Sequence, residues 1–322
     1  MNDKILEIKN LKKYFRVKNG YLHAVDDVSF YINKGETLGL VGESGCGKST
    51  TGRTLIRLLE ANSGEVIFEG KNILDFDKKQ VKEFRKDVQM VFQDPYSCLN
   101  PRLSISNIIA EPLEVNNIYS DKASMQKRVK ELMNIVGIEE RLINSYPHEL
   151  DGGMRQRVGI ARALSIKPKF IVLDEPVSSL DVCIQAQVLN LLKRLQRDFD
   201  LTYLFISHDL SVVKYISDRI AVMYLGKIVE LCDHNIIFKD PIHPYSQALL
   251  SAIPIPKLNA KQDRIIIKGD VPSPVNPPDG CRFAGRCEYA KEICMKETPE
   301  LLEVEKDRFV ACHFARNLVK SV

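Results

Sequence analysis

Hydrophobic and polar residues near the N-terminus alternate as they do in half-buried strands. Residues 5–8 and 25–32 have this two-residue period, and residues 36–41 (ETLGLV) follow as a short apolar run. A glycine-rich stretch comes next, and after it Leu55 and Leu58 recur at helical spacing. The pattern therefore predicts a buried strand, a glycine loop and a helix, in that order.

Two later apolar runs have the length of buried strands. They are residues 170–174 (FIVLD) and 203–207 (YLFIS), and a helical pattern occupies residues 186–199 between them. This order is typical of βαβ units with a parallel sheet. Because residues 95–165 have a mostly helical pattern, notably at 123–136, we expect a helical subdomain inserted into an α/β core.

The character of the chain changes near residue 235. The Pro-rich stretches HPYSQALLSAIPIP and DVPSPVNPPDG belong to a C-terminal part that also carries four cysteines. We expect one nucleotide-binding domain at residues 1–235, with its helical subdomain at about 95–165, and a small Cys- and Pro-rich region at residues 236–322. The sequence has no visible internal repeat, which indicates a single cassette.

Composition and charge narrow the class of protein. The chain has 322 residues, of which 44% are hydrophobic, and 46 Lys and Arg against 42 Asp and Glu give a net charge of +4. This charge is too small to indicate nucleic acid, so we expect no nucleic-acid partner. No apolar run approaches the roughly 20 residues of a membrane-spanning helix, and the N-terminus has no signal-peptide pattern. We therefore expect a soluble, cytosolic chain whose eight cysteines are reduced thiols or metal ligands.

The glycine-rich stretch GESGCGKST matches the phosphate-binding pattern G-x-x-x-x-G-K-[ST]. Its amides would curl around a phosphate at a helix N-terminus, Lys48 would neutralise the outer phosphates and the Ser49 hydroxyl would bind Mg²⁺. A chance glycine turn is disfavoured by the strand before the loop and the helix after it. Cys46 as a nucleophile is disfavoured because the sequence reveals no neighbouring base. The candidate nucleotide-binding residues of the loop are Gly42, Glu43, Ser44, Gly45, Cys46, Gly47, Lys48, Ser49 and Thr50.

Candidate catalytic residues follow the two later apolar runs. Asp174 is placed to hold Mg²⁺ through water, and Glu175 to activate the water that attacks the γ-phosphate. A surface acidic pair is disfavoured because the apolar residues upstream would bury the strand. His208 follows the next run, where it could reach the γ-phosphate. Its neighbours Ser207 and Asp209 do not form a hydrolase triad with it, because adjacent residues cannot converge in that geometry.

In this order, the motifs resemble those of ATP-binding cassette (ABC) proteins over residues 1–240. The residues that carry the resemblance are GESGCGKST, FIVLDEP, SSLD, Gln93 in VFQDP, His208 and DGGMRQR. The resemblance implies an α/β fold: a P-loop NTPase cassette with an N-terminal antiparallel β-subdomain, a helical insertion subdomain and a small C-terminal extension.

The same resemblance assigns several residues that the pattern alone does not. It implies that Phe15, in preference to Tyr14, stacks on adenine. It implies that Gln93 senses the nucleotide, helps to bind Mg²⁺ and contacts the membrane partner. Residues 178–181 would lie along a dimer seam.

The C-terminal part resembles the oligopeptide/dipeptide importers, particularly their second ATPase subunit. This implies a peripheral ATP hydrolase at the cytoplasmic face of the membrane, with ATP and Mg²⁺ as cofactors. The implied partners are a second, non-identical ATPase subunit, two transmembrane permease subunits and, indirectly, an extracytoplasmic binding protein. The alternatives are an importer of nickel chelates or other small solutes, a soluble non-transport ABC ATPase, and half of an exporter.

Two signature residues depart from the family pattern. The usual Leu-Ser-Gly-Gly-Gln is here Leu-Asp-Gly-Gly-Met, in which Asp151, Gly152 and Gly153 would meet the γ-phosphate of the other subunit's ATP. Asp151 is also a good helix N-cap. A carboxylate about 4 Å from a phosphate charge costs about 1 kcal/mol in water and about 4 kcal/mol at an effective dielectric constant of about 20. We therefore expect weakened closure at one site, which favours a heterodimer over a homodimer.

Four cysteines near the C-terminus have the spacing C-x5-C-x6-C-x17-C. Four thiolates suit a tetrahedral metal ion or a cubane iron–sulfur cluster, although the spacing departs from the tight pairs of structural zinc sites. The importer resemblance favours a [4Fe-4S] cluster, and zinc or metal-free thiols remain alternatives. The candidate ligands are Cys281, Cys287, Cys294 and Cys312, whereas we expect Cys98, Cys183 and Cys232 to be ordinary buried or partly exposed cysteines.

Overall fold

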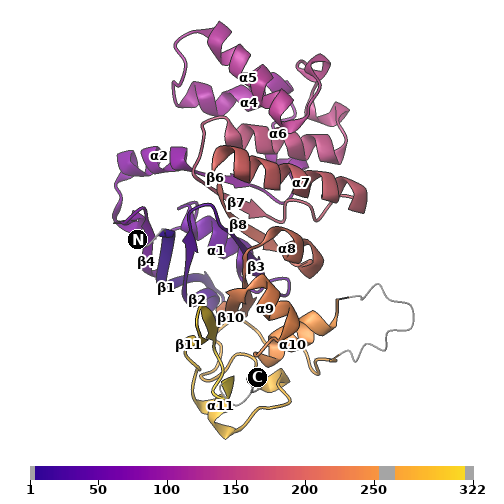
Figure 1. Ribbon diagram of the computed structural model, residues 1–322. Coiled ribbons are helices and arrows are strands. Elements are labelled where there is room, and N and C mark those ends of the chain that lie inside the picture. The colour runs from indigo at the N-terminus through magenta and orange to yellow at the C-terminus, as the bar shows by residue number, and fades with distance from the viewer. Residues whose placement is uncertain (1–3, 254–264, 316–322) are drawn as a thin grey trace, which may run out of the picture. The chain divides into compact units, whose positions relative to one another are not determined.

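The computed structural model describes residues 4–253 and 265–315 (Figure 1). The chain divides into two compact units. The first unit comprises residues 1–75 and 207–322, and the second comprises residues 76–206.

The first unit contains an antiparallel sheet with the strand order β2-β1-β4-β5. The alternating apolar residues predicted as strands lie within β1 and β2, which are longer than predicted because the two strands pair from Lys4↔Asn33 to Val17↔Gly20. This pairing confirms the N-terminal antiparallel β-subdomain (Figure 1). The strands are β1 (Lys4–Val17), β2 (Gly20–Asn33), β4 (Ser63–Phe68) and β5 (Lys71–Asn72).

A second group of strands in the first unit has the order β11-β12-β10-β9-β3. Strand β3 runs parallel to β9, and the other neighbours in this group are antiparallel. Every residue of β3 is buried, as its continuous apolar sequence predicts. The strands are β3 (Thr37–Val41), β9 (Arg219–Tyr224), β10 (Lys227–Asp233), β11 (Leu302–Glu305) and β12 (Arg308–Val310).

Short helices connect the strands of the first unit. The α-helices described there are α1 (Lys48–Leu55), α8 (Leu210–Ile216), α9 (His234–Lys239), α10 (Pro244–Ser251) and α11 (Glu292–Lys296), and the 3₁₀ turns are η1 (Ile73–Asp75) and η4 (Ala284–Arg286).

The second unit contains parallel strands in the order β8-β7-β6. Strands β7 and β8 are buried at every position, which confirms the interpretation of FIVLD and YLFIS as buried strands. The strands are β6 (Val88–Val91), β7 (Phe170–Asp174) and β8 (Thr202–Ser207), and the flanking helices are α2 (Lys78–Asp87) and α7 (Val182–Phe199).

Between β6 and β7 the chain forms the predicted helical subdomain. Helices α4, α5 and α6 contact one another, and Figure 1 shows them as one cluster in magenta and pink. Ile109, Leu132 and Val158, one from each helix, are buried in its core. The elements are α3 (Pro95–Cys98), α4 (Ile105–Val115), α5 (Lys122–Val136), α6 (Gly152–Leu164), η2 (Glu140–Leu142) and η3 (Pro147–Glu149).

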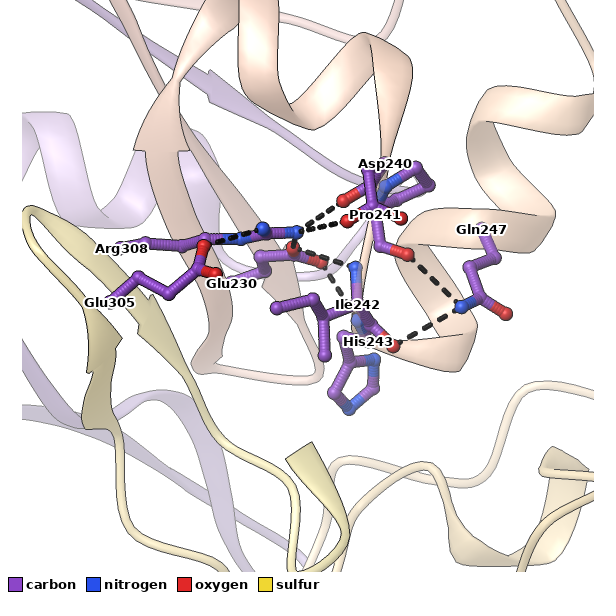
Figure 2. Close-up of polar contacts among 8 residues, drawn as sticks. All are labelled: Glu230, Asp240, Pro241, Ile242, His243, Gln247, Glu305 and Arg308. Carbon is purple, nitrogen blue, oxygen red and sulfur yellow. Dashed lines mark hydrogen bonds and ion pairs between the residues drawn. The ribbon is translucent and has the colours of Figure 1, made fainter. Parts of the chain in front are cut away.

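A buried polar network attaches the C-terminal region to β10. The Glu230 carboxylate accepts hydrogen bonds of 2.9 Å from the amides of Ile242 and His243. Arg308 of β12 lies 3.9 Å from Glu230 and 2.9 Å from Glu305. Burial raises the pKa of Glu230, whereas the hydrogen bonds from Ile242 and His243 and the charge of Arg308 act in the opposite direction. Figure 2 shows these groups together with Asp240, Pro241 and Gln247.

This attachment places the described part of the C-terminal region in the same unit as the glycine loop. Ile242, Val310 and Ala315 form a small apolar cluster that packs against Val304 and Cys312. The expected domain division at residue 235 stays a prediction.

Within residues 4–253 and 265–315, no helix has the length and apolar character that a membrane span requires.

Candidate nucleotide site

The glycine loop lies between β3 and α1, and its conformation requires glycine. Gly42, Gly45 and Gly47 have φ angles of +154°, +79° and +109°. A Cβ atom on Gly47 would lie 2.0 Å from the Ala24 carbonyl oxygen, and one on Gly42 would lie 2.1 Å from that of Met223. The left-handed backbone and the close approach of neighbouring carbonyls therefore exclude larger residues at both positions.

Lys48 closes the loop from inside. Its side chain is buried, and Nζ donates hydrogen bonds to the carbonyl oxygens of Gly42 at 2.8 Å and Glu43 at 3.0 Å. The first hydrogen bond of α1 runs from the amide of Thr51 to the carbonyl of Gly47, so the preceding amides face out of the helix end. A buried ammonium beside such amides fits an anionic phosphate group.

Cys46 packs inside the loop and does not have the properties of a nucleophile. Its side chain is 3% exposed, and burial raises the pKa of the thiol even though Lys48 Nζ lies 3.9 Å from Sγ. A protonated, enclosed thiol does not attack a substrate. Its carbonyl accepts a 2.8 Å hydrogen bond from Gly226, which ties the loop to the turn between β9 and β10.

In the second unit, the predicted catalytic carboxylates stand at the end of β7. Asp174 is fully buried, and the next residue, Glu175, has a φ angle of +47°. The Glu175 amide donates a 2.9 Å hydrogen bond to the carbonyl of Ile206, which holds this uncommon conformation in place. Gln93 donates from Nε2 to Glu175 Oε2 at 2.9 Å. Two predicted site residues, far apart in sequence, therefore meet in this unit.

The signature residue Asp151 caps helix α6. Its carboxylate accepts a 2.7 Å hydrogen bond from the amide of Met154, which confirms the helix-cap interpretation. Gly152 and Gly153 form the first turn, and a Cβ atom on Gly153 would lie 2.5 Å from Ile184 Cγ2. Close packing of α6 on α7 therefore explains the second glycine. Asp151 itself is exposed at the helix end, where a partner's phosphate could approach.

Residues 178–181 continue from Glu175 to the start of α7. The Ser178 hydroxyl donates to the carbonyl of Glu175 at 3.1 Å, and the Asp181 carboxylate caps α7 by accepting from the amide of Ile184 at 3.0 Å. Ser178 and Asp181 are exposed, so they are accessible to a second subunit. Their place at a dimer seam stays a prediction.

Tyr14 and Phe15 differ in the contacts that their side chains make within the chain. Tyr14 stacks on His23 at 4.0 Å between ring centres, and its hydroxyl donates to Asp26 at 2.5 Å. Phe15 is half-buried, with Lys13 Nζ 4.9 Å from the ring centre. This difference agrees with the choice of Phe15 for adenine, which stays a prediction.

His208 is exposed between β8 and α8. Its two neighbours serve the local fold: the Ser207 hydroxyl accepts a 3.0 Å hydrogen bond from the amide of Asp209, and Asp209 caps α8 by accepting from Ser211 at 2.8 Å. Both side chains therefore stabilise the turn that carries the exposed His208.

The sequence analysis missed two residues of the C-terminal region that contact the glycine loop. The Glu43 amide donates to the Tyr245 hydroxyl at 2.9 Å, and Arg286 donates to the Glu43 carboxylate at 3.0 Å. These pairs are 202 and 243 residues apart in the sequence. Tyr245 lies in the stretch HPYSQALLSAIPIP and Arg286 lies between two cysteines of the motif, but nothing in either stretch indicates a contact with the glycine loop.

Within the described residues no cysteine forms a disulfide. Burial, and then the neighbouring thiols of Cys294, Cys312 and Cys287, raise the pKa of Cys281 to about 11. The amide of Cys281 donates a 2.8 Å hydrogen bond to the carbonyl of Cys294, so these two cysteines of the motif lie on adjacent backbone segments. Nevertheless, among residues 4–253 and 265–315 no three His, Cys, Asp or Glu side chains are arranged as a ready-made metal site.

The three remaining cysteines differ in burial. Cys232 is buried, and burial raises its pKa to about 12, whereas Cys98 is half-buried. Cys183 is exposed in the first turn of α7 and does not belong to the buried face of that helix.

Comparisons with known proteins agree with these observations. Residues 25–178 match the ABC transporter family, and residues 229–294 match the oligopeptide/dipeptide transporter C-terminal region. The oligopeptide transport ATP-binding protein AppF of Bacillus subtilis is 51% identical, covering 96% of this chain and 97% of that protein. The oligopeptide transport ATP-binding protein OppF of Haemophilus influenzae is 52% identical, covering 95% of this chain and 93% of that protein.

A similar solved structure is a dimeric ATP-binding cassette in a post-hydrolysis state bound to ADP and Pi. It has a TM-score of 0.65 and 29% identity, and it covers 71% of this chain and 98% of that one. The high identity of the curated relatives over nearly the full length establishes membership: the chain belongs to the ATP-binding proteins of the ABC transporter family, with the C-terminal region of the oligopeptide/dipeptide branch.

Proposed function

We propose that this chain binds ATP with Mg²⁺ and hydrolyses ATP to energise an importer of oligopeptides or dipeptides. The observation that carries the ATPase part is the glycine loop closed by the buried Lys48. The peptide part is supported by the C-terminal region and by the similarity to peptide-transport ATP-binding proteins. In this role the chain is peripheral on the cytoplasmic face of the membrane and contacts membrane permease subunits.

The loop residues hold the nucleotide. The amides of residues 42–50 and the Lys48 ammonium bind the triphosphate, and the Phe15 ring stacks on adenine. Ser49, Gln93 and Asp174 are the proposed ligands of Mg²⁺, which neutralises phosphate charge when bound.

Glu175 is the proposed general base. Its carboxylate takes the proton of the attacking water, while Gln93, hydrogen-bonded to Oε2 at 2.9 Å, holds the carboxylate in one orientation. His208 contacts the γ-phosphate. The first turn of α6 contributes the amides of Gly152 and Gly153 to the ATP bound by the other subunit.

The permease contact is testable by affinity purification from membranes. The tagged chain is expected to retain multi-spanning permease subunits and a second ATPase subunit. Ribosome association without permease subunits would instead support a soluble ABC ATPase.

We further propose a non-identical ATPase partner, although a dimeric cassette is among the similar solved structures. Asp151 supports this proposal because its exposed carboxylate stands at the end of α6 that would face the partner's phosphate. In a homodimer both sites would carry this repulsion. A partner with an ordinary signature spares the site built on Lys48 and Glu175 of this chain.

Removing the Asp151 charge is expected to raise the ATPase activity of the assembled transporter. Asp151→Ser and Asp151→Asn both keep an N-cap acceptor for Met154, so both should increase hydrolysis at the partner's ATP site by about fivefold or more, the factor for about 1 kcal/mol, and thereby raise the total turnover. Asp151→Ala removes charge and cap together and is expected to cost about 1 kcal/mol of stability. Unchanged turnover in the Ser and Asn variants, at equal assembly, would leave Asp151 with only its capping role.

The four-cysteine segment is a proposed [4Fe-4S] site, with zinc and metal-free thiols as alternatives. The proposal is supported by four cysteines in a segment with a small apolar core, two of which, Cys281 and Cys294, are joined by a backbone hydrogen bond. Protein purified without oxygen is expected to contain about four iron and four sulfide ions per chain, as the cubane stoichiometry requires. Cys294→Ser should remove them, whereas Cys183→Ser, at an exposed position outside the segment, should not. Zinc in place of iron, or no metal in anaerobic protein, would reject the cluster.

A further inference from the structure

Glu43 presents an electrostatic problem at the glycine loop. Its carboxylate belongs to the loop proposed to hold the triphosphate, and like charges in such proximity oppose nucleotide binding. The neighbouring residues must therefore either orient the Glu43 carboxylate away from the phosphates or neutralise its charge. Arg286 does the latter, with NH1 donating to Oε2 at 3.0 Å and NH2 to Oε1 at 3.4 Å.

All three polar groups of Glu43 are held. The amide donates to the Tyr245 hydroxyl at 2.9 Å, the carbonyl accepts from Lys48 at 3.0 Å, and the carboxylate accepts from Arg286. Two of these three partners come from the C-terminal region, outside the cassette motifs. The backbone conformation at the start of the loop therefore depends on residues that follow the cassette.

An aromatic cluster holds these two partners in position. Tyr224, Tyr245 and Phe283 are buried, with ring centres 4.6 Å apart for Tyr224–Tyr245 and 5.5 Å apart for Tyr245–Phe283. Arg286 donates to the Tyr224 hydroxyl at 3.3 Å, and the guanidinium carbon lies 5.9 Å from that ring's centre. Because the rings are close-packed, the guanidinium is pre-organised toward Glu43.

Arg286 also lies beside a residue of the proposed chemistry. Glu43, Arg286 and His208 line one open cavity of about 800 Å³ in the first unit. The side chain that neutralises Glu43 and the proposed γ-phosphate contact therefore border the same open space.

We infer that Arg286, supported by Tyr245, is a positioning residue of the nucleotide site: it holds Glu43 and neutralises its carboxylate, so that the C-terminal region sets the affinity of the glycine loop for ATP. This inference rests on the proposed ATP-binding function. Arg286 acts through Glu43 and does not itself take part in bond cleavage.

The test is ATP hydrolysis by the full transporter as a function of ATP concentration. Arg286→Ala is expected to raise the KM for ATP about tenfold or more, the lower end for a charge-assisted hydrogen bond, while kcat at saturating ATP falls far less. Tyr245→Phe removes only the hydroxyl that accepts from the Glu43 amide and should raise KM about threefold. Lys296→Ala, an exposed change in the same region, is the matched control and should leave KM unchanged.

The decisive variant combines Arg286→Ala with Glu43→Gln. If Arg286 acts by neutralising Glu43, removing the carboxylate restores most of the lost ATP affinity, whereas a general packing defect is not rescued. Arg286→Met keeps the aliphatic stem and serves the same comparison if the alanine variant does not fold. A KM that is unchanged in Arg286→Ala, or not restored in the double variant, overturns the inference. A wild-type transporter without ATP hydrolysis would instead reject the proposed function.

Discussion

Glu175→Gln is expected to lower ATP turnover of the assembled transporter about 10²- to 10⁴-fold. The amide has nearly the shape of the carboxylate and can still accept the hydrogen bond from Gln93, so the geometry at the end of β7 is preserved. It cannot take a proton from water, so only hydrolysis is lost. The measurement is phosphate release at saturating ATP, together with ATP binding at equilibrium.

The control for this change is Glu65→Gln on β4. Glu65 is exposed, and its 3.9 Å approach to Lys9 is a surface ion pair of little energetic weight. Its turnover should equal that of the wild type. Turnover in Glu175→Gln within about tenfold of the wild type would mean that another group activates the water.

Lys48→Ala is expected to weaken ATP binding about 10- to 100-fold, the range for charge-assisted hydrogen bonds. The substitution removes the buried cation beside the proposed triphosphate and its hydrogen bonds to the carbonyls of Gly42 and Glu43. Binding of ATP to the full chain, measured by isothermal calorimetry with Mg²⁺ present, gives the change directly.

Lys79→Ala, at an exposed position of α2, tests whether a general loss of positive charge has the same effect. It should not, because the charge of an exposed lysine is largely screened by water and salt. Equal ATP affinity for Lys48→Ala and the wild type would contradict the assignment of the glycine loop as the phosphate site.

Local signals predicted much of the fold. The apolar runs at β7 and β8 were long enough to be recognised as buried strands, and Asp151 followed by a helical pattern was enough to predict the cap of α6. The lengths of β1 and β2 were underestimated, because their pairing continues through polar residues where alternation is absent. Strand ends there are decided by cross-strand hydrogen bonds, which a single strand's sequence does not reveal.

The candidate site was predictable where a motif carries the geometry. The glycine loop is one contiguous stretch of sequence, and the two carboxylates at the end of β7 are adjacent residues. The local pattern alone was therefore enough to predict each of them. Arg286 and Tyr245 reach Glu43 only through the tertiary fold, and an isolated arginine or tyrosine has no distinguishing pattern. The cysteine motif lies between these cases, because its spacing indicates candidate ligands without selecting a metal ion or cluster.

Two acidic residues, Asp151 and Glu43, give the proposed ATP sites an unusual electrostatic character. Glu43 has a guanidinium partner within the chain, whereas Asp151 accepts from the amide at its own helix end and is exposed toward solvent. Glu43, the neutralised carboxylate, belongs to the glycine loop of this chain. Asp151, the exposed carboxylate, belongs to the signature stretch that is proposed to contact the ATP bound by the partner. This difference is the physical basis for expecting the site on Lys48 and Glu175 to be the active one.

The central claim is that ATP hydrolysis by this chain energises peptide import. Its most direct test is uptake of a labelled oligopeptide into proteoliposomes that contain the complete importer and enclose ATP on the side of the ATPase subunits. We predict ATP-dependent accumulation with the wild-type chain and none with Glu175→Gln, although both complexes assemble. Accumulation that persists with Glu175→Gln, or ATP hydrolysis by the wild type that moves no peptide, would contradict the claim.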